Sequence, residues 1–233
     1  MPQDTRPAAP SVAFDTEMAS AYDARNSALA PISDNMHFLI RLALEDLPDR
    51  ARVLCVGVGT GAEILSLARA RPGWRFIGVD PSPAMLSVCR DRLQAEGLMD
   101  RCDLIEGYVQ DAPSDTCDVV LSVLVAHFIR REDRPAFYTA IRERVKPGGV
   151  YVTAEICQDL TSPEYPEMLT YWKRVQSRMG ATPESLENLP ELLRANLGVI
   201  SPEETRALLT AAGFTSVTEF FQAIMIRGFI ARG

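Results

Sequence analysis

The chain is poor in the residue patterns that build metal centres. It contains only two histidines, His37 and His127, and five cysteines, among which no Cys-x-x-Cys or His–Cys pair occurs. Such pairs hold most structural zinc ions, so we expect no metal site. The cysteines are odd in number and mostly lie within strand or helix patterns, which favours reduced thiols in a cytoplasmic protein.

Long apolar stretches and an excess of basic residues are also missing. No apolar run approaches the roughly 20 residues that cross a bilayer. Residues 1–13 lack the apolar core of a signal peptide and are expected to form a flexible tail. The net charge of −7 argues against broad binding to a nucleic-acid backbone. A small molecule is therefore the expected partner, rather than a membrane or a nucleic acid.

The 233 residues, 47% of them apolar, can bury one large core. Strand and helix patterns alternate, which is typical of an α/β fold with a parallel sheet. A helical pattern covers Phe14 to Leu47, and Ser201 starts a late helix as its N-cap. The other patterns predict, in chain order, strand Arg75–Val79, helix Pro83–Ala95, strands Asp103–Ile105 and Val119–Val123, helix Glu132–Val145, and strands Val150–Ala154, Val217–Phe221 and Ala223–Ile230.

The most specific motif is a glycine-rich turn between a strand and a helix. The apolar run Val53–Val56 leads into Gly57, Gly59 and Gly61, and a helical pattern follows from Ala62. Glycines permit positive φ angles and let a ligand approach the backbone closely. The next strand ends at Asp80, close to the roughly 20-residue spacing expected for a carboxylate that binds a ribose diol. The motif predicts a nucleotide-cofactor pocket.

Two cofactor classes use this geometry. Gly57–Ala62 reads GVGTGA, which also satisfies the dinucleotide fingerprint G-x-G-x-x-A. A nicotinamide-dependent oxidoreductase is therefore one alternative. A conventional dehydrogenase needs a second, substrate-binding domain, and the chain leaves little room for one.

Three later segments decide between the two classes. LIEGYVQD at Leu104–Asp111, CDVVLSVLVAHFI at Cys117–Ile129 and VKPGGVYVTAE at Val145–Glu155 follow Asp80 in order. This arrangement resembles the class I S-adenosylmethionine-dependent methyltransferases from about Phe14 to the C-terminus. The resemblance implies one domain, 14–233, with a helical cap at 14–47. Its fold would be a Rossmann-like, doubly wound, mostly parallel seven-stranded sheet with an antiparallel last strand.

The resemblance also implies the cofactor, S-adenosylmethionine, and the residues that hold it. The glycines would lie beneath its methionine part, Asp80 would bind its ribose, and Tyr22 and Arg25 could approach its carboxylate. The remaining implied contacts are Ser82, Met85, Tyr108 and Val109 around the adenine, and Ser122 to Leu124 beside the sulfonium. Two positions depart from the family pattern, since Cys55 and Tyr108 stand where the family often carries acidic residues.

Residues 157–200 interrupt the alternation and follow the carboxyl end of the fifth strand. Ligands bind outside these ends in open α/β sheets, so we interpret this insertion as a helical lid. Tyr165, Tyr171 and Trp172 could line an apolar acceptor pocket, or they could only pack the lid onto the core.

The expected reaction is methyl transfer to a small-molecule oxygen, nitrogen or carbon nucleophile. It is an in-line displacement, in which proximity and alignment provide most of the acceleration. A base is needed only if the acceptor must lose a proton. His127 follows the fourth strand and could act on an acceptor or hold the backbone, whereas Glu155 closes the fifth strand and is expected to face the crevice. His37 is expected to be structural.

Besides the nicotinamide-dependent oxidoreductase, two other functions remain open at this point. The pairing of the SPEETRALLTAAGF helix with the EFFQAIMIRGFIA ending is similar to carboxy-S-adenosylmethionine synthases, in which a cation must hold the added carboxylate. Glu191 occupies the position where that arginine is expected, and Arg194 lies three residues further on. A non-catalytic subunit that binds the cofactor for a partner is another alternative. A homodimer is one expected assembly.

Overall fold

The computed structural model describes residues 26–233. The predicted tail, the first part of the N-terminal cap and the predicted cofactor contacts Tyr22 and Arg25 lie outside the described residues. Within residues 26–233, no helix has the length and apolar character needed to cross a bilayer.

Seven strands form one sheet in the order β3-β2-β1-β4-β5-β7-β6. Strand β7 runs antiparallel to both of its neighbours, and the other pairs are parallel. The strands are β1 Arg52–Val56, β2 Arg75–Asp80, β3 Cys102–Glu106, β4 Cys117–Val123, β5 Val145–Ile156, β6 Ser216–Ala223 and β7 Ile226–Arg232. The predicted Rossmann-like fold with an antiparallel last strand is confirmed.

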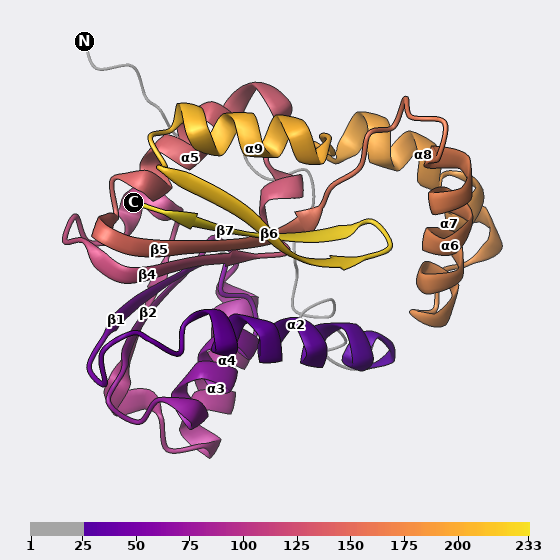
Figure 1. Ribbon diagram of the computed structural model, residues 1–233. Coiled ribbons are helices and arrows are strands. Elements are labelled where there is room, and N and C mark those ends of the chain that lie inside the picture. The colour runs from indigo at the N-terminus through magenta and orange to yellow at the C-terminus, as the bar shows by residue number, and fades with distance from the viewer. Residues whose placement is uncertain (1–25) are drawn as a thin grey trace, which may run out of the picture.

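Helices cover both faces of this sheet (Figure 1). Helices α2 (Ala30–Ala43), α3 (Ala62–Ala70) and α4 (Pro83–Ala95) lie on one face, and α5 (Arg134–Arg142) and α9 (Pro202–Ala211) lie on the other. Each face has its own cluster of buried apolar side chains. Short 3₁₀ turns complete the order at η1 Ser27–Leu29, η2 Met99–Arg101, η3 Val109–Asp111, η4 Ala126–Phe128 and η5 Arg131–Asp133.

Two helices begin where polar caps occur in the sequence. The Ser82 hydroxyl accepts a hydrogen bond from the Met85 amide at 3.2 Å, and Ser201 accepts one from the Glu204 amide at 3.1 Å. A proline follows each serine, and its fixed φ suits the first helical turn. The caps place the start of α4 directly after the carboxyl end of β2.

Residues 157–200 hold α6 (Tyr165–Arg178), α7 (Pro183–Glu187), α8 (Leu189–Glu191) and a π-helical turn, η6 (Leu192–Asn196). They project from the sheet beside the turn of the β6–β7 hairpin (Figure 1). Tyr165 and Trp172 belong to the same apolar cluster as Met225 and Ile226 of that hairpin. The insertion thus packs on the edge of the sheet that β6 and β7 extend.

Several element bounds differ from the predicted ones. Helix α2 ends at Ala43 rather than near Leu47, and α5 begins at Arg134, where Pro135 sits in the first turn. Strand β5 is much longer than predicted. It pairs with β4 from Val145 and with β7 as far as Ile156. These pairings join residues far apart in sequence, which local patterns do not show.

Candidate functional site

The three glycines form a tight loop between β1 and α3, with φ angles of +65° at Gly57, +51° at Gly59 and +82° at Gly61. A Cβ atom at Gly57 would lie 2.5 Å from Val125, and one at Gly61 would lie 2.7 Å from the Cys89 sulfur. A Cβ atom at Gly59 would meet nothing within 4 Å. Gly57 and Gly61 are therefore required for packing, whereas Gly59 leaves open space above the loop.

Asp80 connects this loop to the end of β2. Its carboxylate accepts hydrogen bonds from the Gly59 and Ser82 amides, both at 2.9 Å, and its carbonyl accepts one from the Gly107 amide at 3.0 Å. The residue is 8% exposed. Burial raises the pKa of Asp80, although the two amides favour its ionised form. The structure thus joins three separate sequence motifs at a single residue, two through its carboxylate and one through its backbone carbonyl.

The residues predicted around the adenine lie at the same sheet edge. Asp80 pairs with Glu106 across β2 and β3, so the turn that contains Tyr108 and Val109 follows directly beside it. Met85 and Val109 are buried, and Tyr108 is half-buried. These side chains provide an apolar border next to the Asp80 carboxylate.

A cavity of about 290 Å³ lies on the other side of the glycine loop. Its wall includes η1 and α2, the start of α3, the end of β4 and Ile226 of β7. The wall is largely apolar, with a few polar side chains, as in most small-molecule sites. The polar side chains among the described lining residues are Asn26, Ser27, Ser33, His37, Thr60, Glu63 and Arg92.

Of the predicted segment Ser122–Leu124 at the end of β4, the last two residues line the cavity and the first does not. Ser122 is fully buried, and its hydroxyl contacts the Tyr151 hydroxyl at 2.6 Å and the Thr153 hydroxyl at 3.1 Å. Val123 and Leu124 line the cavity instead. Leu124 has a φ of +57°, a strained conformation for this residue. Within the predicted segment Ser122–Leu124, the cavity wall is therefore formed by Val123 and Leu124, whereas Ser122 is buried in the sheet.

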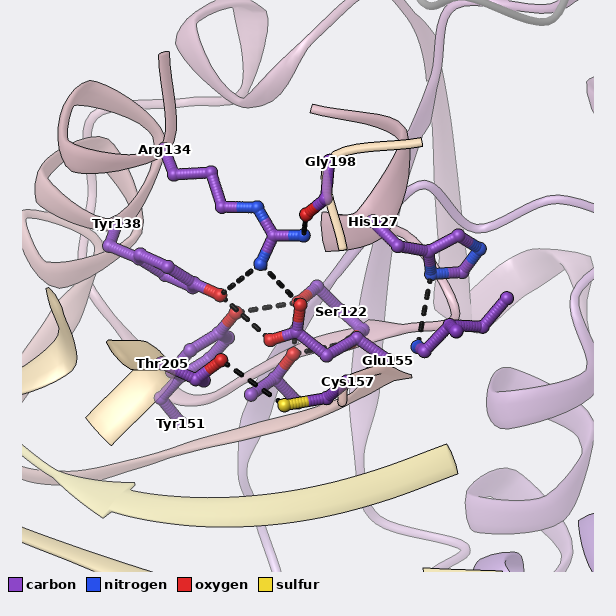
Figure 2. Close-up of polar contacts among 11 residues, drawn as sticks. Ser122, His127, Arg134, Tyr138, Tyr151, Glu155, Cys157, Gly198 and Thr205 are labelled. Atoms are coloured by element: carbon purple, nitrogen blue, oxygen red, sulfur yellow. Dashed lines mark hydrogen bonds and ion pairs between the residues drawn. The ribbon is translucent and has the colours of Figure 1, made fainter. Parts of the chain in front are cut away.

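Glu155 does not face the crevice as predicted. It is fully buried, where it pairs with Arg134 and accepts a hydrogen bond from the Tyr138 hydroxyl at 2.9 Å (Figure 2). Arg134 also donates to the Gly198 carbonyl, at the end of the insertion. Burial alone would lower the pKa of Arg134, but Glu155 and Tyr138 outweigh it and raise this pKa. The Glu155 carboxylate therefore forms a structural ion pair with Arg134 and does not face the crevice.

His127 lies beside this network and not among the cavity-lining residues (Figure 2). Its Nδ1 accepts a hydrogen bond from the Ile156 amide at 3.4 Å, and its carbonyl accepts one from the Gly198 amide at 2.8 Å. Burial, with the nearby Arg134 charge, lowers the pKa of His127 to about 3. The imidazole is thus neutral near pH 7, and its geometry fits a backbone anchor better than a base.

The three residues that were predicted to line an acceptor pocket lie in two different environments. Tyr165 and Trp172 are buried in the apolar cluster, whereas Tyr171 is 38% exposed and donates to Glu167 at 2.6 Å. Tyr171 therefore points to solvent rather than toward an acceptor. Two further residues of the insertion, Glu191 and Arg194, are exposed, and the Arg194 guanidinium lies 5.7 Å from the centre of the Tyr165 ring.

All five cysteines are buried as free thiols. Cys55 lies in β1 beneath the glycine loop, and burial raises its pKa well above the usual range. The thiol is therefore neutral and supplies no negative charge where an acidic residue was expected. Within residues 26–233, no cluster of three or more histidine, cysteine, aspartate or glutamate side chains is placed to hold a metal.

Sequence comparisons agree with this geometry. Residues 53–149 match the family model described as a methyltransferase domain. Carboxy-S-adenosylmethionine synthase of Campylobacter fetus is 26% identical over 97% of this chain and 96% of its own length. The protein of the same name from Wolinella succinogenes is 27% identical over 94% of this chain and 92% of its own.

Solved structures with the same fold include methyltransferases. One is a putative O-methyltransferase from Nostoc punctiforme, with a TM-score of 0.67 at 15% identity. Another is the mitomycin 7-O-methyltransferase, with a TM-score of 0.67 at 21% identity. This chain aligns over 94% and 95% of its length with the two structures, but spans only 59% and 61% of theirs. The chain thus contains a segment that matches a methyltransferase domain and has the fold of solved methyltransferases, which supports an S-adenosylmethionine-dependent methyltransferase-like enzyme, as its motifs predicted.

Sequence reasoning missed three charged or polar side chains of the cavity wall. His37 of α2 was expected to be structural, and Glu63 and Arg92 were given no role. Glu63 stands in the first turn of the helix after the glycine loop, so the motif itself indicates its position at the cavity wall. The position of Arg92, on the following helix, depends on how α3 and α4 pack.

Proposed function

We propose that the protein transfers a methyl group from S-adenosylmethionine to a small-molecule oxygen, nitrogen or carbon nucleophile. The main support is the largely apolar cavity at the glycine loop and the end of β4, where Val123 and Leu124 provide part of the wall. When bound, the cofactor supplies a methyl group already activated on a sulfonium.

The site fits this cofactor by two observations. Gly59 leaves an open cradle where any side chain would protrude toward the ligand. Asp80 presents a mostly buried carboxylate at the sheet edge, where it would accept hydrogen bonds from the ribose diol. The proposed role of the protein is to align the acceptor with the methyl group and exclude water, since proximity can provide most of the acceleration.

Base assistance is not part of this proposal. His127 has a pKa of about 3 and anchors backbone, and Glu155 is held by Arg134. We therefore expect an acceptor that is already nucleophilic near neutral pH, or that loses its proton to solvent. Tyr165 and Trp172 are buried in the apolar cluster and do not line the cavity, so their proposed role is to hold the insertion in place. The acceptor is the proposed partner, and a homodimer the proposed assembly.

Carboxy-S-adenosylmethionine synthesis is the second candidate, because relatives of that name match the chain over nearly its full length. Such a product needs a cation near the added carboxylate. Glu191 stands at the position expected for that cation and is exposed, and Arg194 lies against Tyr165. Among the described residues, the cavity wall contains no cation from the insertion. Methyl transfer is therefore favoured.

Mass spectrometry of small molecules retained by the purified protein separates the two functions. Methyl transfer predicts S-adenosylmethionine or S-adenosylhomocysteine, and acceptor-dependent release of S-adenosylhomocysteine when a panel of phenols, amines and enolisable carbon acids is supplied. Retention of a carboxylated cofactor would favour the second candidate. Cofactor binding without turnover on any acceptor would favour a non-catalytic subunit.

A further inference from the structure

The cavity wall contains charges of both signs close to the glycine loop. Glu63 projects from the first turn of α3, and its side chain is 15% exposed. Arg92 of α4 lines the same cavity, with its Nη1 donating to the Thr60 carbonyl at 3.1 Å and to the Thr60 hydroxyl at 2.9 Å. A wall with one carboxylate and one guanidinium among its described residues is complementary to a zwitterion.

Glu63 is held in place by His37. The Nε2 atom of His37 lies 3.4 Å from the Glu63 Oε1 atom, and the two side chains are 14% and 15% exposed. Since a carboxylate only accepts hydrogen bonds, Nε2–H is the donor. Within residues 26–233, the hydrogen bond of the Glu63 side chain is the one with His37. The contact uses one carboxylate oxygen and leaves the acceptor capacity of the other for a cation.

The strand beneath the loop does not provide this negative charge. Cys55 is 2% exposed, and burial, followed by the nearby Glu63 charge, raises the pKa of its thiol. A neutral thiol does not offset the charge of an ammonium group. Glu63 lies at the opposite end of the loop, in the first turn of α3, and lines the cavity together with Gly57 and Gly59.

We propose that Glu63, oriented by His37, binds the α-ammonium group of the amino-acid part of the cofactor. The carboxylate that the first strand lacks is thus supplied from the first turn of α3. This inference rests on the cofactor of the proposed function and not on its acceptor or on methyl transfer.

The test compares two ligands that differ in the amino-acid part. S-adenosylhomocysteine carries the α-ammonium group, and 5′-methylthioadenosine has the same nucleoside and a thioether but no amino acid. In calorimetry, Glu63→Gln should bind S-adenosylhomocysteine about tenfold more weakly, as expected for loss of one hydrogen bond to a charged group. Its affinity for 5′-methylthioadenosine should not change.

Two further variants make the comparison specific. Asp80→Asn should bind both ligands more weakly, because both contain the ribose. His37→Gln should lower the affinity for S-adenosylhomocysteine less than Glu63→Gln does, since it removes only the contact that orients Glu63. Circular dichroism and thermal unfolding verify that each variant is folded.

Equal affinities of the wild type and Glu63→Gln for S-adenosylhomocysteine would overturn the inference while cofactor binding stands. A parallel loss for both ligands would also overturn it, because Glu63 would then act on the whole pocket. A wild type that binds neither ligand would contradict both the inference and the cofactor, whereas failure of methyl transfer alone would affect only the proposed function.

Discussion

At the residue scale, the glycines of the loop have different roles: Gly61 is required for packing, whereas Gly59 leaves space for a ligand. Gly59 and Gly61 both have positive φ angles, but only Gly61 has a close neighbour, the Cys89 sulfur, on the side where a Cβ would project. Changes at these two positions therefore have different physical consequences.

We predict that Gly59→Ala lowers the unfolding free energy by about 1 kcal/mol, the cost of a left-handed conformation for an L-residue, and weakens binding of S-adenosylmethionine. Gly61→Ala adds steric overlap with Cys89 and should cost about 2–3 kcal/mol. Chemical denaturation and calorimetry measure the two effects. Equal stability losses in the two variants would contradict this account of the loop.

His127 gives the protein a defined sensitivity to acid. Its pKa is 6.5 in the unfolded chain and about 3 in the folded protein, where burial and Arg134 disfavour the imidazolium. The unfolded state therefore binds the proton more tightly. The stability associated with neutral His127 is present above pH 6.5 and is lost as the pH falls toward 3, by about 1.4 kcal/mol per pH unit.

The variant His127→Asn tests this prediction, because its side-chain oxygen can replace Nδ1 as acceptor for the Ile156 amide. Urea unfolding between pH 7 and pH 4.5 should show a shallower loss of stability than in the wild type. His37→Asn serves as the control, since this histidine lies at the cavity wall. If the wild type and His127→Asn lose stability in parallel, His127 is not the group responsible.

At the element scale, the Arg134–Glu155 pair joins α5, β5 and the end of the insertion at Gly198. Removing one partner leaves an uncompensated buried charge, at a cost of about 3–5 kcal/mol. Replacing both partners with apolar residues of similar size avoids this cost.

We predict that Arg134→Met and Glu155→Leu each destabilise strongly, and that the double variant recovers much of the loss. Chemical denaturation in a double-mutant cycle measures the coupling. The control is the exposed pair Arg69–Glu96, whose side chains are 60% and 43% exposed, so Arg69→Gln should change stability by less than about 1 kcal/mol. Additive effects at Arg134 and Glu155 would contradict a coupled pair.

Asp80 and Glu155 show which side-chain positions can be predicted from the sequence at this scale. Both residues lie at the end of a strand, and only Asp80 lies where its motif predicted. The glycine loop and the end of β2 are local features with fixed spacing, so periodicity and turn chemistry locate them. Glu155 was misplaced because its partner Arg134 comes from α5, and no sequence spacing records that packing.

Other elements follow the same rule. The serine cap of α9 lies where the sequence predicted, since capping depends on three or four adjacent residues. The length of β5 and the exposure of Tyr171 depend on long-range pairing and on how the insertion docks. The cavity wall brings α2, α3 and β7 together, so its composition also required the structure.

At the scale of the whole molecule, a ligand that binds only the folded state must stabilise it. Free ligand at 100 times its dissociation constant adds about 2.7 kcal/mol, and each kcal/mol raises the melting temperature of a chain of this size by about 2–4 °C. We predict such a shift with S-adenosylmethionine and none with NAD. Differential scanning fluorimetry makes this comparison, and a shift with NAD alone would favour the oxidoreductase alternative.

The central claim is that the glycine loop and Asp80 bind S-adenosylmethionine. Isothermal titration of the wild type, Asp80→Ala and Gly59→Leu with this cofactor tests the claim most directly. We predict saturable binding to the wild type and a large loss of affinity in both variants, because one lacks the ribose acceptor and the other fills the open space above the loop. Unchanged affinity in both variants would contradict it.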